Sequence, residues 1–203
     1  MTRTIAIVAL TILFAATAFA ADGKLSYGVK LGLNMANQKI DPTPSGVTVK
    51  GRTGFGVGAI INYSMNEKMA IRTDILYLQK GSKMEATGYS GESNFTYLAI
   101  EPFWTYKFSE WSCKLNSKMA SAFFQVGPEI GLCLSAKDKD DKDITGKKST
   151  EIGLNVGVGI NMPMGKGYLS PELRYNMGLT SAAENGGTKA TNNGIGIMFG
   201  YMF

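Results

Sequence analysis

The strongest constraint on the fold is a two-residue alternation that runs through the last ten residues. From Gly194 to Phe203, large apolar residues occupy the odd positions, and glycine or methionine the even ones. A period of two is typical of a β-strand with one apolar face. Soluble sheets normally protect an exposed edge strand with charge or proline, and this stretch has neither. It therefore predicts a strand whose apolar side faces something other than water.

The same alternation recurs in seven earlier segments, so the sequence predicts eight strands separated by turn-rich connections. One segment, 69–81, has apolar residues on both sides, and Arg72 and Asp74 assign its polar face. The eight predicted strands are, in chain order, 25–34, 53–63, 69–81, 97–108, 123–135, 151–163, 168–180 and 194–203.

Soluble barrels or sandwiches and outer-membrane barrels both show such a pattern. Here the apolar faces carry no charge, and their aromatic residues lie largely near segment ends, as in interfacial belts. These aromatic residues are Tyr27, Tyr63, Tyr106, Phe108, Tyr201 and Phe203. The opposite faces are mostly Gly, Ser and Asn, which suits the crowded inside of an eight-stranded barrel. The sequence predicts an all-β fold, an eight-stranded antiparallel up-and-down transmembrane β-barrel of the bacterial outer membrane, with a soluble barrel as the alternative.

Connection lengths predict which end of the barrel faces outward. If both termini are periplasmic, the hairpins at 64–68 and 164–167 are short periplasmic turns, as such barrels prefer. The third periplasmic link, 109–120, is unusually long. Four longer polar stretches become external loops and candidate contact sites for protein partners: 37–51, 81–94, 136–149 and 181–192.

The first 20 residues have the layout of a secretory signal peptide. One cation precedes an apolar run over 5–16, and Ala18-Phe19-Ala20 forms a small-x-small end. Cleavage is expected after Ala20, which leaves 21–203 as one outer-membrane β-barrel domain. The alternative is an N-terminal anchor, for which the run is short of the roughly 20 residues of a span.

Composition argues against several other classes of function. The net charge of +5 is scattered, without a block of interleaved cations and aromatics, so no nucleic-acid partner is expected. The chain has no histidine, the usual general base near neutral pH. We therefore predict no enzyme activity, no catalytic residue and no cofactor. The aspartate-rich stretch 137–148 lacks the sixth-position glycine and the closing glutamate of a calcium loop, so no metal site is predicted.

Five motifs in order resemble the PorT-like outer-membrane β-barrel family, known mainly from Bacteroidetes-type bacteria. They are DILYLQKGSK at 74–83, YLAIEPFWTYKF at 97–108, FFQVGPEIGLCLS at 123–135, LNVGVGINMP at 154–163 and ELRYNMGLTSA at 172–182. The resemblance implies an eight-stranded barrel and no catalytic motif. It also makes Phe203 similar to the terminal signal that such barrels present to the outer-membrane assembly machinery. The named member of the family is associated with a secretion system.

Seven charged residues lie near the middle of the predicted strands, on the small-residue face. They are Lys30, Arg72, Asp74, Glu101, Glu129, Glu172 and Arg174. Buried ions persist by pairing, and a selective channel would favour one sign of charge. Three cations against four anions therefore favour a salt-bridged plug, with a charged pore constriction or ion relay as the alternative.

The two cysteines are not expected to form a disulfide. Cys113 lies in the link 109–120, whereas Cys133 lies about ten strand residues away from that rim, at roughly 3.3 Å per residue. A disulfide needs Cα atoms within about 7 Å. Cys133 is expected to be a small filler of the lumen.

The predicted role is that of a non-enzymatic outer-membrane barrel with a side-chain-filled lumen. It would serve envelope integrity, surface interaction or support of a secretion or assembly system. Its expected partners are outer-membrane lipid, the assembly machinery through the last strand, and proteins at the external loops. A small passive pore or transporter is the main alternative, followed by a lipid-modifying enzyme.

Overall fold

The computed structural model describes residues 25–43, 46–86, 89–112 and 119–203. Its strands are β1 (Leu25–Asp41), β2 (Thr48–Ser64), β3 (Met69–Ala86), β4 (Tyr89–Ser112), β5 (Met119–Asp138), β6 (Thr150–Met164), β7 (Gly167–Gly178), β8 (Ala183–Asn185) and β9 (Thr188–Met202). The predicted signal peptide and Cys113 lie outside the described residues. Within those residues there is no helix with the length and apolar character needed to cross a membrane.

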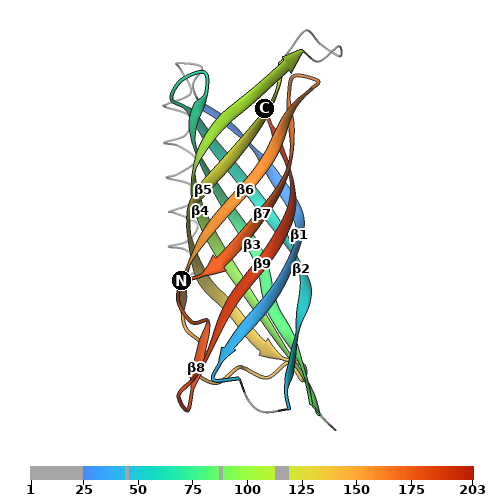
Figure 1. Ribbon diagram of the computed structural model, residues 1–203, viewed down its shortest axis with the longest axis vertical. Helices are drawn as coiled ribbons and strands as arrows, with labels where there is room; N and C mark the ends of the chain where they lie inside the picture. Colours follow the sequence, from blue (N-terminus) through green and yellow to red (C-terminus); the bar gives the residue numbers. More distant parts are fainter. Residues whose placement is uncertain (1–24, 44–45, 87–88, 113–118) are drawn as a thin grey trace, which may run out of the picture.

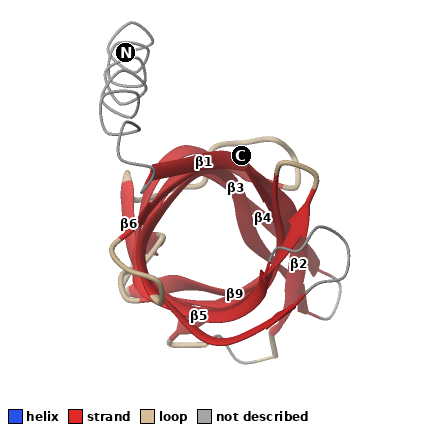
Figure 2. Cartoon of the chain, turned by 90° about the horizontal axis from the view of Figure 1, so that it is seen from above, coloured by secondary structure: helices blue, strands red, loops and turns tan. Residues whose placement is uncertain are grey.

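Eight of the nine strands close into a ring, which confirms the predicted eight-stranded up-and-down barrel. All neighbours are antiparallel, from β1 through β7 to β9, and β9 pairs back onto β1. Figure 1 shows the tall barrel from the side, and Figure 2 shows the closed ring from above. β8 is a short addition that pairs with β9.

Closure explains the apolar alternation of the last strand. β9 pairs with β1 from Gly28↔Met202 to Asp41↔Lys189, and the Phe203 amide donates to the Tyr27 carbonyl at 2.9 Å. A closed ring satisfies its backbone groups internally, which is the condition for strands to cross a bilayer. The odd residues of β9 can therefore face lipid without leaving an open edge.

The barrel is apolar outside and polar inside, the reverse of a soluble protein. On β1, Val29 and Leu31 are 53% and 59% exposed, whereas Lys30 between them is 1% exposed. The same alternation holds along the other long strands. An apolar surface of this extent is stable against lipid rather than water.

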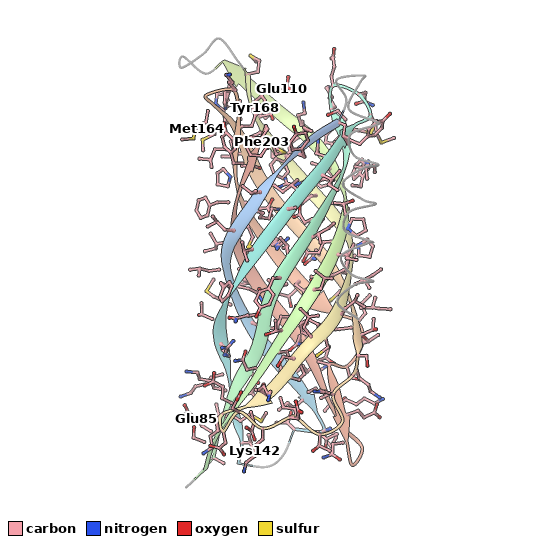
Figure 3. The ribbon with its side chains drawn as sticks, turned by 180° about the vertical axis from the view of Figure 1, so that it is seen from behind. Glu85, Glu110, Lys142, Met164, Tyr168 and Phe203 are labelled. Atoms are coloured by element: carbon pink, nitrogen blue, oxygen red, sulfur yellow. The ribbon has the colours of Figure 1, made fainter. Side chains whose placement is uncertain are left out.

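The two ends of the barrel differ in the length of their connections. Figure 3 labels Glu110, Met164, Tyr168 and Phe203 at one end, which we call the inner end, and Glu85 and Lys142 at the other, the outer end. The inner end has short turns between β2 and β3 and between β6 and β7, whereas the outer end has longer projections. Short periplasmic turns and longer external loops are typical of outer-membrane barrels, so the prediction that the inner end faces the periplasm is kept as an expectation.

The prediction that four outer stretches are loops was wrong in extent. Strand pairing continues through most of 81–94, with β3 and β4 paired up to Ala86↔Tyr89, and β1, β2 and the β8–β9 hairpin occupy much of 37–51 and 181–192. Only 136–149 is mainly irregular. Beyond the bilayer both faces of a strand are solvated, so the alternation that marks membrane strands disappears while backbone pairing continues.

The β8–β9 hairpin turns at two glycines. Gly186 and Gly187 have φ values of 56° and 83°, the positive values at both central positions that a type I′ hairpin turn requires. The turn extends the outer end of the barrel beyond β7.

The β4–β5 ladder has a break at mid-strand. Pairing is present at Ile100↔Ile130 and Trp104↔Val126 but not at the three described positions between them, where the register sets Pro102 opposite Pro128. Proline has no N–H to donate, so two facing prolines remove both bonds of one pair. The break interrupts an otherwise extensive β4–β5 ladder, which also has register shifts at Thr96/Tyr97 and Lys107/Ser109.

Candidate functional site

All seven charged residues predicted from the sequence point into the barrel. Each is between 0% and 5% exposed, and together they come from β1, β3, β4, β5 and β7. They share the strand parity of the small residues, which places them on the lumen side. Their contacts group them into two clusters, which adjoin where the Glu101 side chain meets that of Glu129.

The inner cluster comprises Lys30, Arg72, Asp74, Glu101, Glu172 and Arg174. Its first centre is the Lys30 ammonium on β1, which donates to Asp74 on β3 and, at 2.6 Å, to Glu172 Oε1 on β7. Arg72 reaches the same carboxylates, with Nε 3.3 Å from Asp74 Oδ1 and Nη2 3.3 Å from Glu172 Oε2. Apart from the Arg72–Asp74 contact, which lies within β3, these contacts connect strands that are not neighbours in the ring.

Arg174 is the second centre of the inner cluster. Its Nη1 lies 2.5 Å from Glu101 Oε2 and 3.5 Å from Asp74 Oδ2. Three cations thus face three carboxylates, and each ion has at least one opposite partner. Paired in this way, the cluster avoids the penalty of several kcal/mol that an unpaired buried ion would carry.

The outer cluster comprises Lys80, Glu129, Glu151, Asn155 and Asn176. Lys80 donates to Glu129 and, at 3.1 Å, to Glu151 Oε1. The two asparagine amides donate to Glu129 Oε2, at 3.2 Å from Asn155 and 2.7 Å from Asn176. One cation and two amides therefore stabilise two buried carboxylates.

Sequence reasoning missed Lys80 and Glu151. Both have the parity of the lumen face, since Lys80 continues the row of Arg72 and Asp74, and Glu151 is the first residue of its predicted strand. They stood at the margins of stretches interpreted as loops, so their charge was not assigned to the lumen. Strict extension of the period-two rule would have found both.

A hydrogen-bond network of side-chain amides and hydroxyls continues outward from the outer cluster. Asn192 donates to Glu151 Oε2 at 2.7 Å, and its Oδ1 accepts from Gln38 Nε2 at 3.0 Å. Gln38 Oε1 in turn accepts from Ser82 at 2.8 Å and Ser93 at 2.6 Å. Each buried polar group in this network has a hydrogen-bond partner, as a stable buried network requires.

Apolar side chains fill the space beside and beyond the charges. Leu76, Leu78, Ala99 and Met198 form one buried cluster inside the barrel. Near the outer end a second cluster comprises Phe95, Tyr97, Ala136 and Ala182, with Ile144 packed against it. The inward direction of Leu76 and Leu78 explains why segment 69–81 has apolar residues on both sides.

The arrangement is suited to cross-linking and filling the barrel rather than to chemistry. Among the described residues, no group of three or more Asp, Glu or Cys is placed to hold a metal ion. Within each cluster the charged side chains are directed at one another across the lumen. Their salt bridges join different strands of the barrel.

The comparisons with known proteins agree with this architecture. A family model described as "Outer membrane protein beta-barrel domain" matches residues 15–184. The chain belongs to this family. It is therefore a protein of the bacterial outer membrane, and the narrower resemblance to PorT-like barrels stays a prediction.

Several solved structures resemble this outer-membrane barrel. Neisserial surface protein A is 15% identical with a TM-score of 0.52, over 87% of this chain and 97% of its own. OprG from Pseudomonas aeruginosa is 15% identical with a TM-score of 0.48, over 88% of this chain and 94% of its own. Ail of Yersinia pestis, crystallised with the heparin analogue sucrose octasulfate, is 15% identical with a TM-score of 0.43, over 89% of this chain and 99% of its own. The likeness to Neisserial surface protein A supports the fold alone, and no curated protein matches the chain.

Two further residues singled out from the sequence are not members of the inner or the outer charged cluster. Phe203 is 61% exposed at the inner rim, and its ring centroid lies 5.8 Å from that of Tyr27 and 5.3 Å from that of Tyr201. Cys133 is a free thiol, half-buried against the second apolar cluster, and its Sγ lies 3.5 Å from the Ser135 carbonyl.

Proposed function

We propose that this protein is a non-enzymatic outer-membrane barrel whose lumen is closed and which acts through its surfaces. In this proposal it serves envelope integrity, surface interaction or support of a secretion or assembly system. The observation that carries the proposal is the cross-strand pairing of nine buried ions, six in the inner cluster and three in the outer cluster.

Energetics favour a closed lumen over an ion path. A permeating ion would have to displace partners that compensate buried charges, and leaving one such charge unpaired costs about 3–5 kcal/mol. Four cations and five carboxylates also give no strong preference for one sign, unlike the charge rings of selective pores. The interior therefore supports a structural role more than a passive pore.

The outer end is the best candidate for contact with partners. The hairpin of β3 and β4 projects there, and two of its carboxylates pair with cations of β2. Glu85 forms an exposed ion pair with Lys50 at 2.6 Å, and Glu92 a partly buried one with Arg52 at 2.8 Å. Lys148 and Glu184 pair at 3.2 Å, joining the irregular stretch to β8. An ordered, mixed-charge surface of this kind fits protein partners or lipid headgroups.

The finer parts of the proposal concern targeting and family. Removal of residues 1–20 by cleavage after Ala20 and use of Phe203 in assembly both follow from the sequence pattern. Support of a secretion system follows from the PorT-like resemblance alone. N-terminal sequencing of the mature protein would test the first point, with Ala21 as the expected first residue.

Complementation of a deletion strain would test whether the protein acts through its surface or its lumen. One variant combines Glu101→Gln with Arg174→Gln and so removes an internal pair, and the other replaces 140–147 with a short Gly-Ser linker. Folding of both would be verified by the heat-dependent gel mobility of barrels. The proposal predicts that only the internal variant restores resistance to detergent. Rescue by the external variant but not the internal one would overturn it.

A further inference from the structure

The inner end of the barrel opens into a cavity of about 350 Å³. Tyr168, Glu110 and Phe203, labelled at this end in Figure 3, contribute to its rim, and Arg72 and Thr105 lie among its deeper residues. Arg72 also belongs to the inner cluster, so the cavity extends from the mouth of the barrel to the first layer of paired ions.

Buried polar atoms of Arg72 and Thr105, which line the cavity, and of the adjacent Gln125 and Glu172 have no hydrogen-bond partner among the described residues. They are Arg72 Nη2, Thr105 Oγ1, Gln125 Nε2, Gln125 Oε1 and Glu172 Oε2. The register of β4 and β5 sets Thr105 directly opposite Gln125. Arg72 Nη2 and Glu172 Oε2 form an ion pair at 3.3 Å, but neither atom makes a hydrogen bond.

The chemistry of these atoms selects the ligand. Arg72 and the Gln125 amide donate, the Gln125 carbonyl and Glu172 accept, and the Thr105 hydroxyl does both. An anion would be repelled by Glu172, and a cation by Arg72. A buried polar group left unpaired costs about 1–3 kcal/mol, and water satisfies donors and acceptors alike when it has two to four polar partners.

The outer half of the lumen is different. A second cavity, of about 380 Å³, opens at the outer end beside Gln38 and Ser93, but the residues of the outer cluster are not among those that line it. Gln38, 3% exposed, is bonded through its amide to Asn192 and through its carbonyl to Ser82 and Ser93. Of the seven buried side-chain atoms without a hydrogen-bond partner in the described parts of the chain, five are those at the inner cluster, and two, on Arg52 and Asn94, lie towards the outer rim.

We propose that the inner half of the lumen is a water-filled blind inlet. Ordered water enters from the periplasmic mouth, bonds Thr105, Gln125 and the free positions of Arg72 and Glu172, and ends at the inner cluster. The ion pairs of that cluster are then hydrated from one side only, whereas the outer cluster is dry. The inference goes beyond the proposed function, because a closed barrel could equally have a dry interior throughout.

Water-to-amide cross-relaxation in NMR spectra of the wild-type protein in nanodiscs tests the inlet. The probe is the side-chain amide of Gln125, which is 0% exposed. The matched control in the same molecule is the side-chain amide of Asn155 in the outer cluster, which is 1% exposed, donates to Glu129 and is not among the residues that line the cavities at the two ends of the barrel. The inlet predicts a cross-peak to water at Gln125 and none at Asn155. Absence of the Gln125 cross-peak, or equal cross-peaks at both amides, would overturn it.

Thiol labelling supplies a second test. In a Cys113→Ser, Cys133→Ala background, Thr105→Cys places a thiol at the deep wall of the inlet, and Ala99→Cys places one in the apolar cluster of the lumen, at a position that is 0% exposed. A small charged methanethiosulfonate reagent should label the first at least tenfold faster than the second, and only from the periplasmic side. Equal rates, or labelling of Thr105→Cys only from the outer side, would contradict the inlet.

Discussion

Arg174 Nη1 and Glu101 Oε2 lie 2.5 Å apart, although their strands, β7 and β4, are separated in the ring by β5 and β6. The pair therefore spans the lumen rather than following the wall. Both side chains are buried, at 5% and 1% exposure. Interactions of this kind cross-link strands that no backbone ladder connects.

Replacing either partner of this pair should lower the free energy of unfolding strongly. Replacing both should lower it by much less than the sum of the two single losses. We expect Glu101→Gln and Arg174→Met each to lower the free energy of unfolding by about 3–5 kcal/mol, because each leaves a buried charge without its nearest partner. The double variant should cost no more than the worse single one. Urea unfolding in lipid vesicles, followed by tryptophan fluorescence, measures all three.

The exposed pair Lys50–Glu85 is the control for this cycle, because its 2.6 Å separation is as short but its side chains are 56% and 49% exposed. Its coupling energy should stay below about 1 kcal/mol. Strict additivity at Glu101 and Arg174 would mean that the internal pair does not act as a unit.

Lys80 should contribute far more than Lys83 to the free energy of unfolding. Lys80→Met leaves Glu129 and Glu151 facing each other without their cation, and we expect a loss of about 3–5 kcal/mol. Lys83 is 53% exposed and lies 4.0 Å from Glu92, so Lys83→Met should cost less than about 1 kcal/mol. The same unfolding assay compares them, and similar losses for both variants would refute the role of the outer cluster.

Gly58 should not tolerate a methyl group. A Cβ built there would lie 1.9 Å from the Ile75 carbonyl oxygen, a backbone atom on the neighbouring strand. We expect Gly58→Ala to lower stability by about 1–3 kcal/mol or to block refolding. At Gly153 the nearest atom would lie at 3.1 Å, so Gly153→Ala should be the milder change. Equal refolding yields would argue against close packing of β2 and β3.

The outer loop should show one carboxyl with a lowered pKa. A hydrogen bond and ion pair with Lys147, 2.9 Å away, hold the pKa of Asp143 below its usual value. A lowered pKa in the folded state means that the pair stabilises the loop above the ordinary aspartate pKa and loses its effect as pH falls through the folded value. NMR titration should show this shift, and Lys147→Gln should return the Asp143 pKa towards normal. An unchanged pKa in that variant would place the cause elsewhere.

The membrane part of the barrel was predictable from sequence because lipid imposes a simple rule on it. Each lipid-facing residue must be apolar, so strand parity, the faces and the inward direction of Arg72, Glu101 and Glu172 all follow from the period of two. The PorT-like motifs supported the same fold.

The extension of the strands at the outer end and the partners of the individual buried ions were not predictable by that rule. Strands that extend past the bilayer, such as the end of β3 near Glu85, have two solvated faces and lose the signal. Pairs such as Lys80–Glu151 depend on strand tilt and side-chain reach, which alternation does not encode. Leu76 shows the converse: an apolar residue can face the lumen when it packs against Met198.

Single-channel recording of the refolded mature protein in planar bilayers tests most directly whether the lumen is closed. Wild-type protein should give no steady conductance steps, because paired ions and apolar side chains fill the path. A variant with Glu101, Glu129 and Glu172 all changed to Gln should fold poorly, since four buried cations would face too few carboxylates. Steady, ion-selective steps from the wild type, altered in that variant, would contradict the closed lumen and identify the protein as a pore.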